Sequence, residues 1–199
     1  MSKIPELMSG RALEHGIAMA VDHGGTSSSK MYVGGQANAD VAAGTTTVSS
    51  TAENVASQYT IPANTLVAGS TIRVRFVTLT ADQGGNDLTI RLRFGKDGST
   101  ITNDTECAVN TAVTQADNDF CVGDMIIQVR TETTAVAFGT ISDSDALGSK
   151  LVSAQFEPSF TIDTKVANYV SVTTQWDGSN ADNETTTQAF IVDIVNPAT

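Results

Sequence analysis

The feature that most constrains the fold of this 199-residue chain is a period of two in its apolar residues, which runs through most of the sequence after its first quarter. In one stretch Ile72, Val74 and Phe76 alternate with Arg73 and Arg75. Successive side chains of a β-strand point to opposite faces, so this spacing predicts a strand with one apolar face and one polar face.

A second run of the same kind follows a turn rich in Asp, Asn and Gly, and its apolar residues are Leu88, Ile90, Leu92 and Phe94. Because the two runs are consecutive, they predict a hairpin of adjoining strands. The alternation recurs at residues 125–129, 136–138, 160–162, 170–176 and 190–194, and more weakly at 59–61 and 105–109.

These runs bring the expected number of strands near the eight of a jelly roll. No helix-length apolar period separates them, which excludes βαβ units and a doubly wound nucleotide-binding fold. Charged residues make up only 17% of the chain, and its many Thr, Ser and Val residues suit half-buried pleated surfaces. The sequence therefore predicts an all-β fold, a jelly-roll-like antiparallel β-sandwich over residues 58–199.

Residues 1–57 differ from the rest, with few large apolar residues, glycine pairs and a Thr/Ser tract at 45–51. We interpret them as an extended N-terminal arm and linker, with a short helix over 9–21 that Ser9 is placed to cap. The arm carries seven apolar residues that lack the alternation needed to join the β core: Ile4, Leu7, Met8, Leu13, Ile17, Met19 and Val21. We expect these side chains to contact a partner protein.

The net charge of −11 argues against nucleic acid and anionic membrane as partners, since both require Lys and Arg to neutralise phosphate. No apolar run approaches the roughly 20 residues of a membrane helix, and no signal peptide is evident. Cys107 and Cys121 are the only cysteines. They are too few for a disulfide framework, so we expect free, structural thiols.

Catalytic and cofactor sites are not indicated. The only histidines, His15 and His23, lie in the arm, where a solvated pair is a better interpretation than a metal-ligand pair. The chain has no G-x-S-x-G nucleophile elbow. Residues 95–100 (GKDGST) miss the spacing of a phosphate-binding loop and read as a polar turn. We therefore expect no enzymatic activity, no metal and no cofactor.

Carboxylates are plentiful, so composition alone leaves a glycosidase pair open. Calcium is the other ligand to consider, but the candidate stretches do not fit an EF-hand loop and solvated turns are the better interpretation. These stretches contain Asp143, Asp145, Asp177, Asp182 and Glu184.

Trp176 and Tyr169 are the residues that a sugar-stacking platform would use. Trp176, however, falls on the apolar parity of its strand together with Val170 and Val172. The sequence therefore favours a core tryptophan.

Five arginines lie on the outward parity of predicted strands: Arg73, Arg75, Arg91, Arg93 and Arg130. Like charges that face each other across a sheet repel, so these guanidinium groups need carboxylate neighbours. The carboxylates belong either to the same chain, with Glu132 and Asp193 as candidates, or to a partner surface that meets a basic face. The sequence leaves both possibilities open.

Three segments carry a resemblance to structural domains of tailed-phage virions, which occur in head decoration (cement) proteins and in tail or fibre proteins. They are residues 60–66 (TIPANTL) with Gly69 and 72–74; residues 88–95 (LTIRLRFG); and residues 172–177 (VTTQWD) leading to Asn183 and 189–195. The resemblance spans about residues 59–195 and brings no functional residues with it.

The resemblance implies a viral structural protein, and one short domain with an arm, without coiled-coil heptads, favours the head over a fibre. We expect a decoration protein that binds the outer surface of an assembled capsid, with its arm along the major capsid protein. It would be made in the host cytoplasm and form a homo-oligomer, a dimer or trimer, on the virion. The alternative is a tail or fibre domain that recognises a host glycan, followed by a glycoside-active domain.

Overall fold

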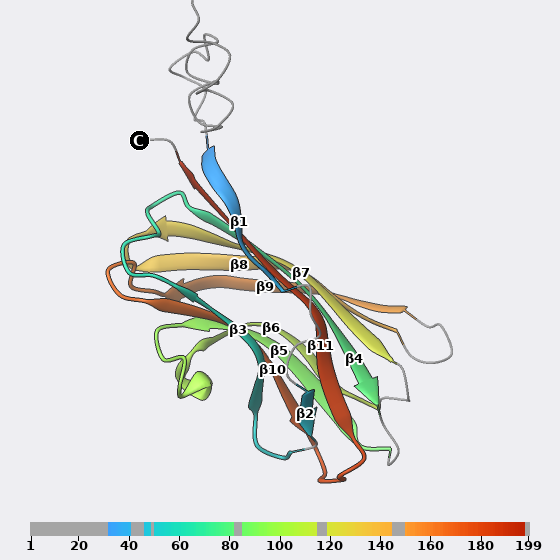
Figure 1. Ribbon diagram of the computed structural model, residues 1–199. Coiled ribbons are helices and arrows are strands. Elements are labelled where there is room, and N and C mark those ends of the chain that lie inside the picture. Colours follow the sequence, from blue (N-terminus) through green and yellow to red (C-terminus); the bar gives the residue numbers. More distant parts are fainter. Residues whose placement is uncertain are drawn as a thin grey trace, which may run out of the picture.

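The protein is described by a computed structural model at residues 32–40, 46–48, 50–81, 85–114, 119–144 and 150–197, and these residues form two antiparallel sheets packed as a sandwich (Figure 1). The large sheet has the order β1 (Tyr32–Asp40), β11 (Glu184–Pro197), β4 (Thr71–Ala81), β7 (Phe120–Thr131), β8 (Thr134–Ser144) and β9 (Lys150–Thr161), with β2 (Thr46–Val48) also paired to β11. The small sheet has the order β3 (Asn54–Ile61), β10 (Asn168–Trp176), β5 (Asp87–Gly95) and β6 (Thr105–Thr114), and a 3-10 turn (Ile101–Asn103) joins β5 to β6.

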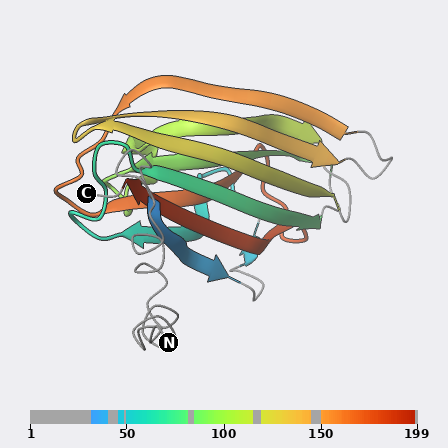
Figure 2. The same ribbon diagram turned by 90° about the horizontal axis from the view of Figure 1, so that it is seen from above.

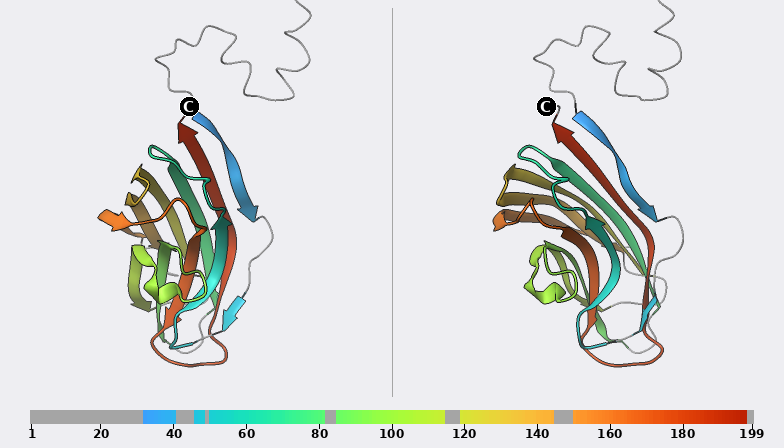
Figure 3. Two further views of the ribbon diagram at one scale, coloured as in Figure 1. Left: turned by 90° about the vertical axis from the view of Figure 1, so that its left-hand side faces the viewer. Right: turned by 60° about the vertical axis from the view of Figure 1, so that its left-hand side comes forward.

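The two sheets form the predicted antiparallel sandwich, and their strand order, which the sequence left open, is that of a jelly roll. Strands from the two ends of the chain pair with each other: β3 with β10 in the small sheet, and β4, β1 and β2 with β11 in the large sheet. Paired strands from the two ends of the chain therefore run through both sheets, as in a jelly roll. Figure 3 shows the two sheets from the side. The hairpin of β8 and β9 extends the large sheet beyond β7.

The predicted boundary between arm and sandwich at residue 57 does not match the strands. β3 begins at Asn54, and β1 and β2 pair with β11 through backbone hydrogen bonds. An edge strand can pair in this way without an apolar alternation, which is why the sequence pattern missed β1 and β2. The predicted helix over 9–21 and the seven apolar arm residues lie outside the described residues.

The predicted hairpin of residues 72–76 and 88–94 is wrong. These residues belong to β4 and β5, which lie in different sheets, β4 between β11 and β7 and β5 between β10 and β6. Both strands turn their apolar residues inward, but from opposite sides of the sandwich. Alternation identifies the buried face of a strand but not the sheet to which the strand belongs, so the sequence pattern is equally consistent with a hairpin and with a crossover.

The core is one apolar layer between the sheets. Its largest fully buried side chains include Trp176, Phe76, Phe94 and Phe190. Phe94 of β5 packs edge-to-face against Phe160 of β9, with ring centroids 5.9 Å apart, and so joins the two sheets. The burial of Trp176 confirms the prediction that this residue belongs to the core.

Cys107 and Cys121 are buried, free thiols, as the sequence predicted. Burial, reinforced by the nearby Asp143 carboxylate, raises the pKa of Cys121 to about 12. Burial also raises the pKa of Cys107. Both side chains therefore act as small apolar groups in the core.

Gly123 of β7 faces Phe76 of β4 across the large sheet, and a Cβ atom at position 123 would overlap the Phe76 ring. We expect Gly123→Ala to lower the free energy of unfolding by roughly 1–3 kcal/mol, because the buried ring has no free space to enter. Urea unfolding measures the loss. The Phe76→Leu background removes the overlapping ring atoms, so there the same alanine should cost at least about 1 kcal/mol less. Equal costs in both backgrounds would contradict this packing.

Candidate functional site

The five arginines do not form one basic face. Arg73 and Arg75 lie on the outer face of the large sheet, whereas Arg91 and Arg93 lie on the outer face of the small sheet, on the opposite side of the sandwich. Arg130, near the end of β7, is exposed and has no ion pair with any described residue. A single surface that presents all five to a partner is therefore excluded.

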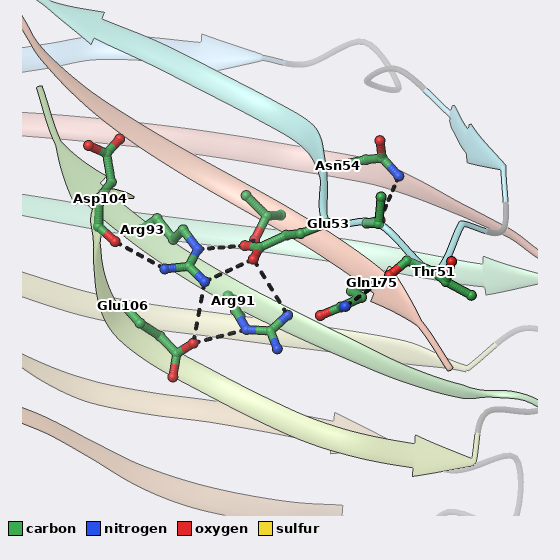
Figure 4. Close-up of polar contacts among 10 residues, drawn as sticks. Thr51, Glu53, Asn54, Arg91, Arg93, Asp104, Glu106 and Gln175 are labelled. Carbon is green, nitrogen blue, oxygen red and sulfur yellow. Dashed lines mark hydrogen bonds and ion pairs between the residues drawn. The ribbon is translucent and has the colours of Figure 1, made fainter. Parts of the chain in front are cut away.

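On the small sheet, the arginines surround the carboxylate of Glu53 (Figure 4). Arg93 donates from Nε to Oε1 at 2.5 Å and from Nη2 to Oε2 at 2.8 Å, a bidentate pair. The hydroxyl of Thr173 also donates to Oε1, and Nη1 of Arg91 lies 4.0 Å from Oε2. The Glu53 side chain is only 6% exposed, so this carboxylate has exchanged water for protein donors.

Glu106 of β6 supplies the second carboxylate of this network. Nε of Arg91 donates to it at 2.9 Å, and Nη2 of Arg93 lies 3.7 Å away. Two arginines and two carboxylates thus balance, and both guanidinium groups are mostly covered. For Arg91 and Arg93, pairing within the chain is confirmed and no positive charge is left for a partner.

The network also fixes the segment that leads into β3. Burial by itself would raise the pKa of Glu53, but the hydrogen bonds from Arg93 and Thr173 and the attraction of both arginines lower it below the ordinary 4.5. Nearby, Gln175 donates to the Thr51 carbonyl at 2.9 Å, and the Trp176 amide donates to the Ser50 carbonyl at 2.9 Å. Sequence reasoning missed Glu53 because it was assigned to the arm, away from the strands.

On the large sheet, Arg73 pairs with Asp124 at 2.6 Å and Arg75 pairs with Asp193 at 3.1 Å. Asp193 was a predicted partner and is confirmed as one. Glu132, the other predicted carboxylate, pairs instead with Lys165 at 2.9 Å. These pairs are exposed to solvent, so each contributes little to stability.

The outer face of the large sheet, whose strands Figure 2 shows side by side, also carries exposed phenylalanines on β8 and β9, beyond the strands of these ion pairs. Phe138 of β8 and Phe156 of β9 are cross-strand partners, 42% and 68% exposed, and Phe138 also faces Ile126 of β7. The sequence pattern placed Phe138 in the core, but the core contains Ala135, Ala137 and Ile141 of β8, which lie on the opposite parity. The small side chains of the two alanines gave the sequence pattern too weak a signal.

The same face carries a shallow apolar depression over β11, β4 and β7. Its volume is about 240 Å³. It is lined by Arg75, Phe76, Val77, Val122, Gly123, Asp124, Ala189 and Ile191. The register of β11 against β4 shifts between Thr187 and Ala189, which places an irregularity of the sheet beside the depression.

A larger cavity of about 410 Å³ lies between the β5–β6 connection and the β9–β10 connection, with Asp97, Asp104, Asp163 and Asn168 in its lining. One oxygen of Asp104 accepts a hydrogen bond from the Asp97 amide, and burial raises the pKa of this carboxyl group. Residues 95–100 form the predicted polar turn, closed by a hydrogen bond from the Thr100 amide to the Asp97 carbonyl. No group of three or more His, Cys, Asp or Glu that could hold a metal ion occurs in the described part of the chain.

Among the carboxylates considered for calcium, Asp177, Asp182 and Glu184 are exposed, in agreement with solvated positions. Asp143 is instead buried, so the solvated reading is wrong for this residue, while Asp145 lies outside the described residues. In the described segments no helix is long and apolar enough to cross a membrane.

The chain matches no model of a known protein family, and no curated protein matches it. Its function is therefore inferred from its own residues and geometry.

Glu53→Gln should lower the free energy of unfolding at pH 7 by roughly 1–3 kcal/mol, because it weakens charge-assisted hydrogen bonds to a covered site. The folded pKa of Glu53 is depressed, so its stabilisation is present above pH 4.5 and is lost as the pH falls through the lower folded value. The difference between variant and wild type, measured by urea unfolding, should therefore shrink on acidification.

Glu132→Gln provides the matched control, because its ion pair with Lys165 is exposed on both sides. This variant should change stability by less than about 1 kcal/mol at any pH. Equal losses in the two variants would show that the Glu53 network has no special role.

Proposed function

We propose that this protein is a viral structural protein, a capsid decoration (cement) protein that binds the outer surface of an assembled tailed-phage head and stabilises it. The observation that carries the proposal is the outer face of the large sheet, where exposed phenylalanines lie beside an apolar depression. Contiguous exposed apolar surface is typical of a protein–protein interaction site.

The fold is consistent with this role, because jelly rolls serve in viral shells and in lectins. The paired arginines and the lack of a metal-binding group in the described residues give no positive indication of catalysis. Such a protein acts by binding energy alone. A subunit that binds only the assembled shell stabilises that state by mass action.

The arm supplies the contact with the capsid in this proposal. Residues 1–31 precede β1, and a chain of that length spans roughly 100 Å when extended. We propose that its seven apolar residues, Ile4, Leu7, Met8, Leu13, Ile17, Met19 and Val21, lie along the major capsid protein. A segment that orders on binding can cover a large partner surface.

The second candidate is a tail or fibre domain that recognises a host glycan. The exposed pair of Phe138 and Phe156 favours it, because aromatic faces stack on sugar rings. Trp176, the residue first considered for stacking, is buried and contributes nothing to such a site. A glycan array compared with co-sedimentation on emptied capsids separates the two, and strong glycan binding without capsid binding would reverse the ranking.

Deletion of residues 1–30 should leave the melting temperature within a few degrees of the full chain, because the deletion ends before β1 begins at Tyr32. Capsid occupancy should fall at least tenfold, which corresponds to about 1.4 kcal/mol. Co-sedimentation with emptied capsids measures the occupancy. Full decoration by the truncated chain would contradict the anchoring role.

Substitution within the full chain provides a control for the deletion. Leu13→Asp with Ile17→Asp should reduce occupancy as the deletion does, because it places charges on the proposed apolar contact. Ser27→Asp with Ser28→Asp adds the same charge to the same arm and should leave occupancy unchanged. Equal effects of the two pairs would indicate electrostatic repulsion, not apolar anchoring.

A further inference from the structure

We propose that the outer face of the large sheet is the contact between two copies of this chain, which meet face to face about a two-fold axis. In the proposed virion role this face makes the contact between subunits and the arm makes the contact with the capsid, and the dimer is tested in the free protein without capsids. It rests on the shape, the charge and the size of that face.

The face has a self-complementary shape, which a two-fold contact requires because the same patch serves both subunits. The protruding pair Phe138 and Phe156 stands on β8 and β9, whereas the depression lies over β11, β4 and β7. A two-fold axis that lies in the contact plane, midway between pair and depression, places the phenylalanines of each copy against the depression of the other. Because the phenylalanine pair and the depression lie on different strands, both contacts of the dimer can form at the same time.

The middle of the face is electrically neutral, although the chain as a whole is acidic. Two arginines, Arg73 and Arg75, are paired with Asp124 and Asp193 on this face. These four charges cancel, so they contribute nothing to the net charge of −11. Two copies of an acidic chain repel each other, and these neutral pairs keep that repulsion out of the middle of the contact.

The ion pairs lie on β11, β4 and β7, the strands of the depression, and Arg75 and Asp124 belong to its lining. Across the sheet, Asp193 faces Arg73, Arg73 faces Ile126, and Ile126 faces Phe138, while the next row brings Arg75 opposite Asp124. With the axis midway between the phenylalanine pair and the depression, β4 of one copy lies against β8 and β9 of the other. The phenylalanines of each copy therefore meet the ion-paired Arg73 and Arg75 at the depression, where a guanidinium group and an aromatic ring attract each other.

The size of the face is adequate for a stable dimer. From β11 to β9 the sheet is roughly 24 Å wide, at about 4.8 Å per strand. Strands of 11 or 12 residues give a length of roughly 37 Å. The resulting area, on the order of 900 Å², matches the roughly 800 Å² that each partner of a standard interface buries.

The full-length chain without capsids should sediment as a dimer in analytical ultracentrifugation. Phe138→Ser with Phe156→Ser should weaken the dimer at least tenfold and leave the melting temperature close to that of the wild type, because both rings are exposed. Val67→Ser with Val166→Ser is the matched control, since both valines are exposed but lie outside the large sheet, and it should leave the dimer intact. A monomeric wild type at its highest soluble concentration would overturn the proposal.

Cross-linking tests the arrangement within the dimer. Phe156→Cys in one chain and Ala189→Cys in another should form a disulfide when the two variants are mixed, because the first site approaches the depression of the partner. Within one chain these positions are four strands apart, roughly 19 Å, far beyond the 7 Å limit for a disulfide. Cross-links only between identical variants would refute the proposed two-fold axis.

The arm is the competing occupant of this face. Leu13→Asp with Ile17→Asp in the full chain should leave the dimer unchanged, since the face is built from described strands alone. Loss of the dimer in this variant would mean that the arm, and not a second sheet, covers the face. If the Leu13→Asp with Ile17→Asp variant remains a dimer but no longer binds capsids, the dimer contact and the capsid contact are shown to be different surfaces.

Discussion

The two sheets pack against each other through one apolar layer, and the rest of the structure depends on the burial of this layer. Each strand contributes alternate side chains, so Phe76 and Phe190 enter from the large sheet while Phe94 and Trp176 enter from the small one. At roughly 25 cal/mol per Å² of apolar surface, such burial is the main force opposing chain entropy. Because each sheet packs one face against this layer, function must use the outer faces, the edges or the connections, where the larger cavity lies.

The charged residues of the two outer faces are paired in different ways. On the small sheet, Arg91 and Arg93 are enclosed with Glu53 and Glu106, so the network fixes the start of β3 and offers no free charge to a partner. On the large sheet, the ion pairs stay exposed and stand among phenylalanines. The buried network on the small sheet stabilises the fold, whereas the exposed face of the large sheet is suited to contact with another protein.

Periodicity predicted the strands of residues 58–199, the core tryptophan and the outward arginines, since these depend only on side-chain parity. It did not predict that β4 and β5 belong to different sheets, because parity carries no information on partners. It missed β1 and β2, which pair through their backbones, and it missed Glu53, whose importance arises from residues 40 and 120 positions away. Phe138 was misplaced because its neighbours on the inward parity, Ala135 and Ala137, have small side chains.

The pairing of β1 with β11 brings Tyr32 opposite Pro197, so the described chain begins and ends at the same corner of the large sheet (Figure 1). Any tension on the preceding residues enters the sandwich along the axis of β1. A pull directed away from Asp40 then loads the hydrogen bonds to β11 together, in shear, and does not peel them apart one at a time. A tether attached at this corner therefore transmits mechanical force into a whole ladder of bonds.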